Sequence, residues 1–495
     1  MHRGILVSAL FAVSLLLLAC SPKDNDSIRF ALQSMPVTLD PRFSTDAAGS
    51  RINRLLYQRL VGFDDNFQAI PELAEWQQLD SQHYRFVLIE ADRQFHHDGH
   101  QLNTHDVTAT FEYIKDPANA SPHQTTLAVI SRIKIIDEKT LDFYLSEPDV
   151  LFPTRLDIAI LPANLIALDH NFHDNPIGSG EFKFVRKPSP TRLQLQRLSD
   201  KQYFEFTHVP NPTTRVLKLV NDEIDMMQND ISPELVTYLD KHKGINVERS
   251  RGSNFTYIGF NLQSNTLSNL LVRQALAYGL NKAEIIKFLF QGSARPANTI
   301  LTDDHWAGNS ALRDYEYNPE LARKLLNDAG YDDTRPLELS YKTSSDPFRI
   351  RLATVIQSQL EAIGVLVDIR SYDWGTFYGD IKLGRFQLYS LSWVGTKSPD
   401  IFRHVFHSSA VPPKGANRGR YINHQVDNLI EAAALESDAA AQAQFYQQIQ
   451  SIIHDDLPYI PLWYEDHVYL SRDTISGYSM SVDGSYDGLK TVVKR

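Results

Sequence analysis

Several residue types and patterns are scarce or absent in the sequence, and each absence excludes a class of protein. It has one Cys in 495 residues, which excludes a disulfide-stabilised scaffold and a zinc ribbon built on cysteine pairs. It has no run of basic residues, and 60 acidic side chains outnumber 49 Lys and Arg, so we expect no nucleic acid as a partner. Because 42% of the residues are hydrophobic and the charges are interspersed, extensive disorder is excluded as well. The composition therefore indicates a large globular protein with several folding units of about 100 to 200 residues each.

Contiguous motifs of catalytic chemistry are also missing. The chain has no G-x-x-x-x-G-K-[ST] phosphate loop, no H-E-x-x-H and no G-x-S-x-G. Catalytic triads and carboxylate pairs are assembled in space rather than in sequence, so a secreted hydrolase remains an alternative. No spacing in this chain favours one, and we expect a protein that is not an enzyme and binds no cofactor.

Four histidines come closest to a metal-ligand pattern: His96, His97, His100 and His105. The first two are adjacent on an expected strand, where neighbouring side chains point to opposite faces. The residues that follow indicate a turn and then the start of a helix, which separates the remaining two. His404 and His407 could share a helix face but have no third ligand in the sequence. We therefore predict no metal site.

The N-terminus has the pattern of an export signal. Arg3 precedes an apolar run at residues 5–18, which is shorter than the about 20 residues needed to cross a hydrocarbon core. The run ends in Leu17, Leu18, Ala19 and Cys20, which resembles the lipobox at which a bacterial lipoprotein is cleaved and its Cys acylated. We expect residues 1–19 to be a signal peptide, Cys20 the lipid anchor and residues 20–27 a tether; an ordinary signal peptide with an incidental Cys is the alternative. The predicted location is the periplasm or the cell surface, anchored to a bacterial membrane.

Hydrophobic periodicity divides the rest of the chain into alternating strands and helices. Strands are predicted at residues 84–90, 134–136, 141–145, 182–185, 193–196, 256–261, 365–369 and 386–393. Asn318 and Pro319 begin a predicted helix that Gly330 ends, and Asn281 with Glu284 is typical of a capping box that begins another. A third helix is expected through residues 352–360. The predicted fold class is α/β, of mixed α+β character.

A series of short motifs, in one order along the chain, resembles the family 5 extracellular solute-binding proteins, the peptide-binding components of bacterial ABC importers. The motifs are P-V-T-L-D-P at 36–41, L-A-E-W at 73–76, P-I-G-S-G-E-F at 176–182, Y-I-G-F-N at 257–261, V-R-Q-A-L at 272–276, A-G-Y at 329–331 and Y-I-P-L at 459–462. Each is weak alone, but together they span nearly the whole chain after the tether.

The resemblance implies a two-lobed periplasmic-binding-protein clamp with an extra inserted domain. Lobe I would comprise residues 28–57, 176–258 and 465–495, with a satellite domain at 58–175 inserted into it. Lobe II would comprise residues 259–464, and the hinge would lie near 257–261 and 462–466. The implied function is to bind a peptide or other small-molecule ligand, as a monomer, and to deliver it to an ABC permease in the inner membrane.

The resemblance also implies which residues meet the ligand. In relatives the ligand backbone pairs with an extended segment after the Asp-Pro motif, here Thr45, Asp46 and Ala47, and with another around a Trp, here Ser392, Trp393 and Val394. Main-chain hydrogen bonds of this kind supply affinity that is indifferent to side chains. Trp374, nineteen residues before Trp393, matches a tryptophan of the pocket wall, and His123 falls where some relatives place a Tyr that touches the ligand. For both tryptophans, plain core packing is the alternative.

One position departs from the family pattern. Relatives that hold a free peptide amino group carry an Asp three residues after the Trp, and here that position is Thr396, followed by Lys397. An unpaired buried ammonium costs about 3 to 5 kcal/mol. Either another acid reaches that point, with Asp46, Asp373 and Asp400 as candidates, or the ligand has no ammonium there. A modified peptide, a sugar-containing molecule or a metal chelate is therefore a competing ligand class.

Overall fold

The computed structural model describes residues 27–90 and 93–495. The predicted signal peptide, Cys20 and all but the last residue of the tether lie outside these residues, so the lipid anchor stays a prediction. One mixed sheet runs through the protein in the strand order β15-β14-β16-β12-β17-β11-β1-β10-β9-β8, with β13 paired to β17. In the part of the chain that the structure describes, no helix is long and apolar enough to cross a membrane.

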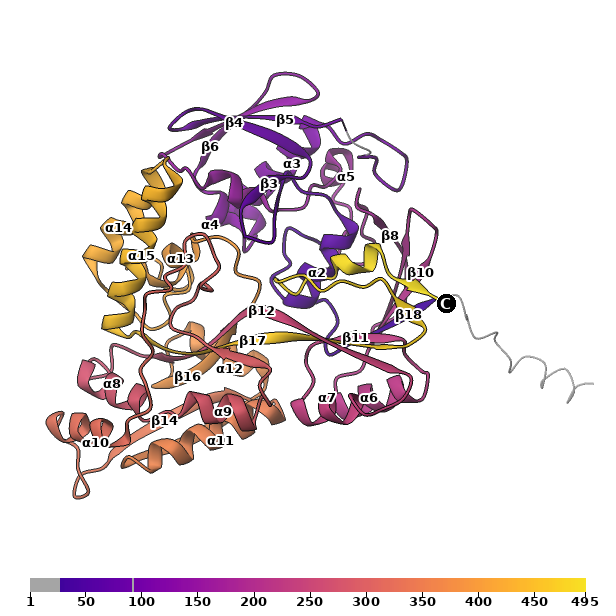
Figure 1. Cartoon of the computed structure of the whole chain (residues 1–495). Coiled ribbons are helices and arrows are strands. Elements are labelled where there is room, and N and C mark those ends of the chain that lie inside the picture. The colour runs from indigo at the N-terminus through magenta and orange to yellow at the C-terminus, as the bar shows by residue number, and fades with distance from the viewer. Residues whose placement is uncertain (1–26, 91–92) are drawn as a thin grey trace, which may run out of the picture.

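Two long strands connect the halves of this sheet. β12 (Ile245–Phe260) and β17 (Tyr459–Arg472) pair antiparallel from Ile245 opposite Arg472 to Gly259 opposite Tyr459. Figure 1 shows both strands crossing the middle of the molecule, with α6 and α7 near one end and α8 to α11 near the other. Since each strand contributes to both halves, the two lobes of the molecule share this ribbon.

The first lobe contains the first and the last strand of the described residues. Its strands are β1 (Ile28–Leu32), β8 (Phe182–Ser189), β9 (Arg192–Arg197), β10 (Tyr203–His208) and β11 (Met226–Gln228), with the small pair β18 (Ile475–Ser476) and β19 (Val493–Lys494). Its helices are α2 (Ala47–Leu56), α6 (Pro212–Val220), α7 (Pro233–Leu239) and the 3₁₀ turn η3 (Asp487–Lys490). Phe30, Phe204 and Phe206 lie at the centre of its core.

The satellite has its own antiparallel sheet in the order β4-β5-β7-β6. These strands are β4 (Ala74–Asp80), β5 (His83–Leu88), β6 (Ile130–Ile135) and β7 (Thr140–Leu145), and β2 (Val61–Phe63) pairs with β3 (Ala69–Pro71) beside them. The helices of this region are α3 (Thr104–Lys115), α4 (Gln124–Leu127), α5 (Ala163–Ala167), η1 (Pro117–Asn119) and η2 (Phe152–Leu156). Phe86, Phe111 and Phe143 pack together in a core separate from that of the first lobe.

The second lobe contains the other half of the large sheet. Its strands are β13 (Ala294–Pro296), β14 (Leu337–Ser344), β15 (Val365–Tyr372) and β16 (Leu388–Trp393). Its helices are α8 (Leu270–Tyr278), α9 (Lys282–Phe288), α10 (Pro319–Asp328), α11 (Pro347–Glu361), α12 (Trp374–Lys382), α13 (Ile401–Phe406), α14 (His424–Leu435) and α15 (Ala439–Asp456). The helices cover the sheet through two clusters of buried apolar residues.

The predicted strands and helices are all present, and the differences lie at their ends. Asn318 accepts a hydrogen bond from the Leu321 amide to cap α10, as predicted, and Gly330 follows with φ +87°. α11 begins at Pro347, earlier than residue 352, because the carboxylate of Asp346 caps it. β12 begins at residue 245 rather than 256, because its first half is polar and largely exposed and lacks the apolar alternation that predicts a strand.

Backbone contact explains the glycines of the 176–182 motif. A Cβ atom on Gly178 would lie 2.0 Å from the carbonyl oxygen of Leu56, and one on Gly180 would lie 2.5 Å from that of Leu55. Gly180 also donates its amide hydrogen bond to Leu56. The motif therefore holds the C-terminal end of α2 against the strand that starts at Phe182, and this fixes the helix that follows Thr45 and Asp46.

Candidate functional site

The end of β16 is fixed to the ribbon shared by the lobes. Trp393 lies opposite Phe255 of β12, and Ser392 lies opposite Thr256. The Ser392 and Thr256 hydroxyls are 2.6 Å apart, and Thr256 Oγ1 donates to the carboxylate of Glu465 at 2.8 Å. Two of the expected ligand residues are thus held by contacts to β12, and the next, Val394, is 45% exposed.

Trp393 lies in a cluster of aromatic and cationic side chains. The ring of His404 meets it edge to face at 6.0 Å, and the guanidinium of Arg418 lies 4.7 Å from its centroid. Arg418 donates to the hydroxyls of Tyr257 at 3.0 Å and Tyr378 at 3.3 Å. The indole N–H of Trp393 is buried and makes no hydrogen bond to the described residues.

Trp374 joins the same cluster from α12. It is the first residue of that helix, is 60% exposed, and stacks on Tyr378 with ring centroids 5.5 Å apart. Because Tyr378 also accepts from Arg418, a continuous series of contacts links Trp374 to Trp393. The structure therefore brings together the two tryptophans that the sequence singled out, and its exposure excludes core packing as the explanation for Trp374.

The other expected wall lies where α2 begins. Asp46 has extended backbone angles and caps α2, accepting from the Gly49 amide at 2.8 Å. The extended segment therefore ends at Asp46, and the expectation that Ala47 continues it is wrong, because Ala47 is the first residue of the helix. Thr45 and Ala47 are both exposed.

His123 reaches this wall from the satellite. Its Nε2 lies 2.9 Å from the carbonyl oxygen of Ser44, next to Thr45. Burial lowers the pKa of His123, so the neutral ring donates Nε2–H to that carbonyl. The residue is thus placed beside the expected ligand segment, and its contact with the ligand stays a prediction.

The three acids considered as substitutes at Thr396 have other partners. Asp46 caps α2, and Asp373 caps α12 by accepting from the Thr376 amide at 3.1 Å. Asp400 accepts from both terminal nitrogens of Arg155, each at 3.1 Å. Each carboxylate is therefore occupied within the protein.

The loop after Trp393 connects the second lobe to the rest of the molecule. Lys397 Nζ lies 3.1 Å from a carboxylate oxygen of Asp483 in the first lobe and 3.4 Å from one of Asp157. Burial would raise the pKa of Asp483, but the ammonium of Lys397 and the guanidinium of Arg54 hold it well below its usual range. The Arg155 pair with Asp400 and a 3.2 Å contact between the hydroxyls of Thr154 and Ser398 add two more links to this loop.

Two histidines of the metal-ligand pattern, His96 and His97, have separate partners. His96 contacts the carbonyl of Gly180 at 2.8 Å, and His97 pairs with the adjacent Asp98 at 3.1 Å. Across residues 27–90 and 93–495, no three His, Cys, Asp or Glu side chains are grouped so that they could hold a metal ion.

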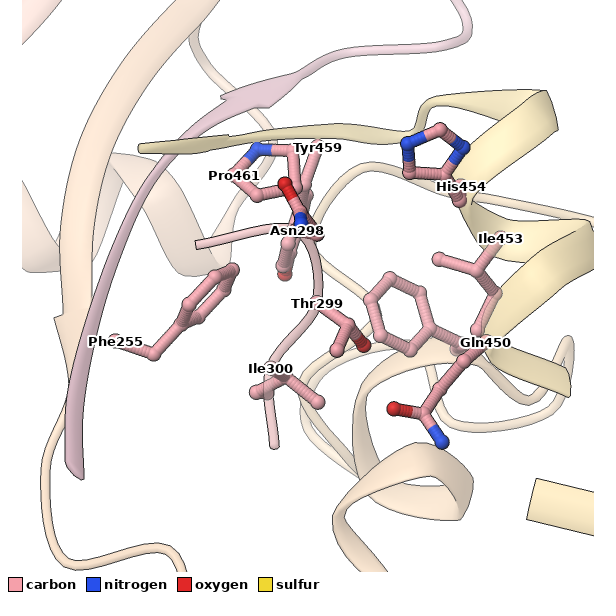
Figure 2. A pocket seen from close by; sticks show the side chains of 10 residues that line it. Phe255, Asn298, Thr299, Ile300, Gln450, Ile453, His454, Tyr459 and Pro461 are labelled. Atoms are coloured by element: carbon pink, nitrogen blue, oxygen red, sulfur yellow. The ribbon is translucent and has the colours of Figure 1, made fainter. Parts of the chain in front are cut away.

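A small internal cavity lies elsewhere, between β17 and α15 (Figure 2). Its volume is about 20 Å³, enough for about one water molecule, and its lining includes Thr299, Ile453 and Tyr459. None of the expected ligand residues lines it.

Sequence reasoning missed the residues that organise this region. Arg418 contacts Tyr257, 161 positions earlier, and Arg155 contacts Asp400, 245 positions later. No local pattern marks either arginine, because each contact depends on how the lobes and the satellite fold together.

Comparison with known proteins identifies the family. The model of the bacterial extracellular solute-binding proteins, family 5 Middle, matches residues 68–411. The dipeptide-binding protein of Escherichia coli (strain K12) is 27% identical, with 87% of this chain and 88% of that protein covered. Di/tripeptide-binding protein 2 of Pseudomonas aeruginosa (strain UCBPP-PA14) is also 27% identical, with 91% of each chain covered.

Solved structures share the fold over almost the whole chain. NikZ from Campylobacter jejuni in complex with Ni(L-His) superimposes with a TM-score of 0.83 at 25% identity, covering 96% of this chain and all of the other. DppA from Helicobacter pylori in complex with the peptide STSA gives the same score and identity, covering 94% and 98%. The two-lobed fold predicted from the motifs is therefore confirmed, and the chain belongs to the bacterial extracellular solute-binding proteins of family 5.

Proposed function

We propose that this chain is the substrate-binding component of an ABC transporter and binds a peptide between its two lobes. The names of the similar dipeptide-binding and di/tripeptide-binding proteins support a peptide ligand, as does the peptide bound to the similar DppA. The observation that carries the proposal is a series of ion pairs from Arg54 on α2 through Asp483 to Lys397. It joins the helix that follows Thr45 and Asp46 to the loop that follows Trp393.

In this proposal the peptide backbone pairs with the main chain of Thr45 and Asp46 on one side and of residues 392–394 on the other. Strand addition gives affinity that tolerates different side chains. A ligand that touches both lobes favours the closed state by its differential affinity, and a permease can recognise that state. Trp374 and Trp393 would form the apolar wall for a ligand side chain.

The remaining parts of the proposal concern how the protein is organised and held. Lobe I comprises residues 28–57, 176–258 and 465–495, the satellite 58–175, and lobe II 259–464. Cys20 carries the lipid anchor that keeps the monomeric protein at a bacterial membrane, in the periplasm or on the cell surface, beside its permease. The family's extracellular solute-binding character supports this location.

A non-peptide ligand is the second candidate. Thr396 stands where peptide-binding relatives carry an acid, and the similar NikZ was crystallised with Ni(L-His) rather than a peptide. A metal chelate needs no ammonium partner, so Thr396 does not weigh against it.

The deciding experiment is mass spectrometry of the small molecules released on denaturation of protein that was purified without refolding. A peptide supports the first candidate, and a metal chelate or a sugar-containing molecule the second. Small-angle scattering then tests closure with the molecule that was found: a radius of gyration that does not change at saturation contradicts the clamp. Recovery of the ligand intact after hours of incubation argues against the hydrolase alternative, and turnover supports it.

A further inference from the structure

Arg418 is a buried cation without an anionic partner. It is 6% exposed, and none of the carboxylates among the described residues lies within 4.0 Å of its guanidinium. Its hydrogen-bond acceptors are the hydroxyls of Tyr257 and Tyr378, and the ring of Trp393 lies against it. A guanidinium has five N–H donors and stays protonated at any physiological pH, so two neutral hydroxyls leave it with donors to spare.

Three other buried arginines have no carboxylate of the described residues within ion-pair distance, but each donates to backbone carbonyls. Arg93 donates to the carbonyl of Ile89 at 2.7 Å. Arg273 donates four hydrogen bonds, all to backbone carbonyls: those of Leu267, Ser268, Asp456 and Leu457. Arg215 donates three, to the backbone carbonyls of Val209, Pro210 and Asp230. These arginines hold chain segments together. Arg418 makes no hydrogen bond of this kind, so a purely structural role explains it less well.

The side chains around Arg418 form one face of the second lobe, the Arg418 face, which we define as Trp374, Tyr378, Trp393, His404 and Arg418. The face reaches solvent at its rim, because Trp374 and His404 are exposed. The His404 ring is open to solvent on one side only: loss of water where it packs against Trp393 lowers the pKa of His404, and the positive charge of Arg418 lowers it further. The nearest candidate acids along the chain, Asp373 and Asp400, have partners elsewhere. The face therefore carries an uncompensated positive charge beside two tryptophans.

We propose that Arg418 anchors an oxyanion of the bound ligand, specifically a carboxylate held against the free edge of the guanidinium between Trp393 and Tyr378. This inference rests on the proposed function, since it assigns a chemical group to the ligand of that site. A carboxylate accepts two parallel N–H bonds from a guanidinium, and it supplies the charge that the protein lacks there. In a peptide the group is either the C-terminal carboxylate or an acidic side chain.

Matched ligands separate these two sources. Isothermal titration calorimetry on the chain without its signal peptide would compare alanyl-phenylalanine, its C-terminal amide and aspartyl-phenylalanine amide. We expect the free acid to bind about 30-fold or more tightly than the amide, because the amide leaves the buried cation unpaired. If aspartyl-phenylalanine amide recovers the affinity, a side-chain carboxylate serves equally. If wild type binds all three alike, the inference is wrong, without any need of a variant.

The variants test whether Arg418 is the anchor. Arg418→Met should abolish the preference for the acid, and Arg418→Lys, which keeps a charge but not the planar fork, should retain part of it. Arg385→Met is the matched control, because it removes an exposed guanidinium of the same lobe. An undiminished preference in Arg418→Met would overturn the inference, and loss of stability without loss of preference would show that the role is structural.

A measurement without peptides separates this inference from the proposed function. Thermal unfolding in about 100 mM sodium formate, against the same concentration of sodium chloride, reports occupation of the anion site by the smallest carboxylate. We expect formate to raise the Tm of wild type and of Arg385→Met but not of Arg418→Met. If no peptide binds and this pattern holds, the peptide function is wrong and the anion site stands. If peptides bind but neither formate nor the free carboxylate matters, the anion site is wrong and the peptide function stands.

Discussion

Replacing Lys397 by Met should weaken the closed arrangement of the lobes. The ammonium of Lys397 is the group of the second lobe that contacts Asp483 and Asp157, at 3.1 and 3.4 Å. Its side chain is 15% exposed, and those of the two acids are 13% and 25% exposed. Methionine keeps most of the apolar stem but leaves both carboxylates without this partner when the lobes close.

The free-energy cost of Lys397→Met depends on how well Asp157 and Asp483 stay paired with other cations. Removing one partner of a fully buried ion pair costs about 3 to 5 kcal/mol, and an exposed pair is worth at most about 1 kcal/mol. Here the pair is partly exposed, and Asp157 keeps Arg59 at 2.7 Å while Asp483 keeps Arg54 at 3.8 Å. We therefore expect a cost of about 1 to 2 kcal/mol, which shifts the ratio of closed to open molecules about 5- to 30-fold.

Small-angle scattering of the ligand-free protein measures this shift. We expect a larger radius of gyration for Lys397→Met than for wild type, and an expansion of wild type in about 1 M salt, where the Debye length falls to about 3 Å. Lys324→Met is the matched control, because Lys324 is exposed and lies outside every ion pair of the described residues. If Lys397→Met has the same radius as wild type and responds to salt in the same way, these ion pairs do not hold the lobes together.

Three further predictions concern single residues. Burial lowers the pKa of His305 to about 4, so the ring stays neutral in the folded state while the unfolded chain binds a proton. The free energy of unfolding should therefore fall by about 3 kcal/mol as the pH drops from 6.5 to 4. Denaturant titrations should show a smaller loss in His305→Gln. Gly178→Ala would place Cβ 2.0 Å from the Leu56 carbonyl oxygen and should lower the unfolding free energy by about 2 kcal/mol or more; a Tm equal to that of wild type would contradict the close contact. Trp374→Ala should change stability by less than about 0.5 kcal/mol because the side chain is 60% exposed, yet it should weaken ligand binding, as should Trp393→Ala; unchanged affinity in both variants would refute the proposed wall.

Local signals in the sequence predict most of the second lobe. The helix α10 is capped by Asn318, has Pro319 as its first residue and is followed by Gly330 at positive φ, as their positions in the sequence predict. Such signals are local, because capping and chain reversal depend on a few neighbouring residues. The polar half of β12 has no such signal. Its strand conformation comes from pairing with β17, more than 200 residues away, and tertiary pairing of that kind leaves no periodic pattern in the sequence.

Part of the candidate site is likewise predictable from local sequence, and part of it depends on the tertiary fold. The backbone segments around Asp46 and Trp393 could be located from the motifs, because a motif marks a place in the chain. Lys397 could be noticed, but its role could not, since Asp157 and Asp483 come from two distant parts of the fold. No local sequence pattern marks Arg418. Its proposed role depends on a ligand carboxylate, because no carboxylate of the described residues pairs with it.

The helix caps formed by Asp46 and Asp373 have a signal in the sequence. Each Asp stands directly before a helix, where an Asp side chain usually caps the first amide groups, so neither carboxylate is free for a ligand ammonium. With both carboxylates assigned to helix caps and Asp400 paired with Arg155, the charge left over at this site is positive, on Arg418. None of these three carboxylates is then free to replace the acid that Thr396 lacks. Among the described residues this site offers a buried cation, while its three candidate acids are all paired, so it favours a negative ligand group. The search for its ligand should therefore begin with carboxylates rather than with amines.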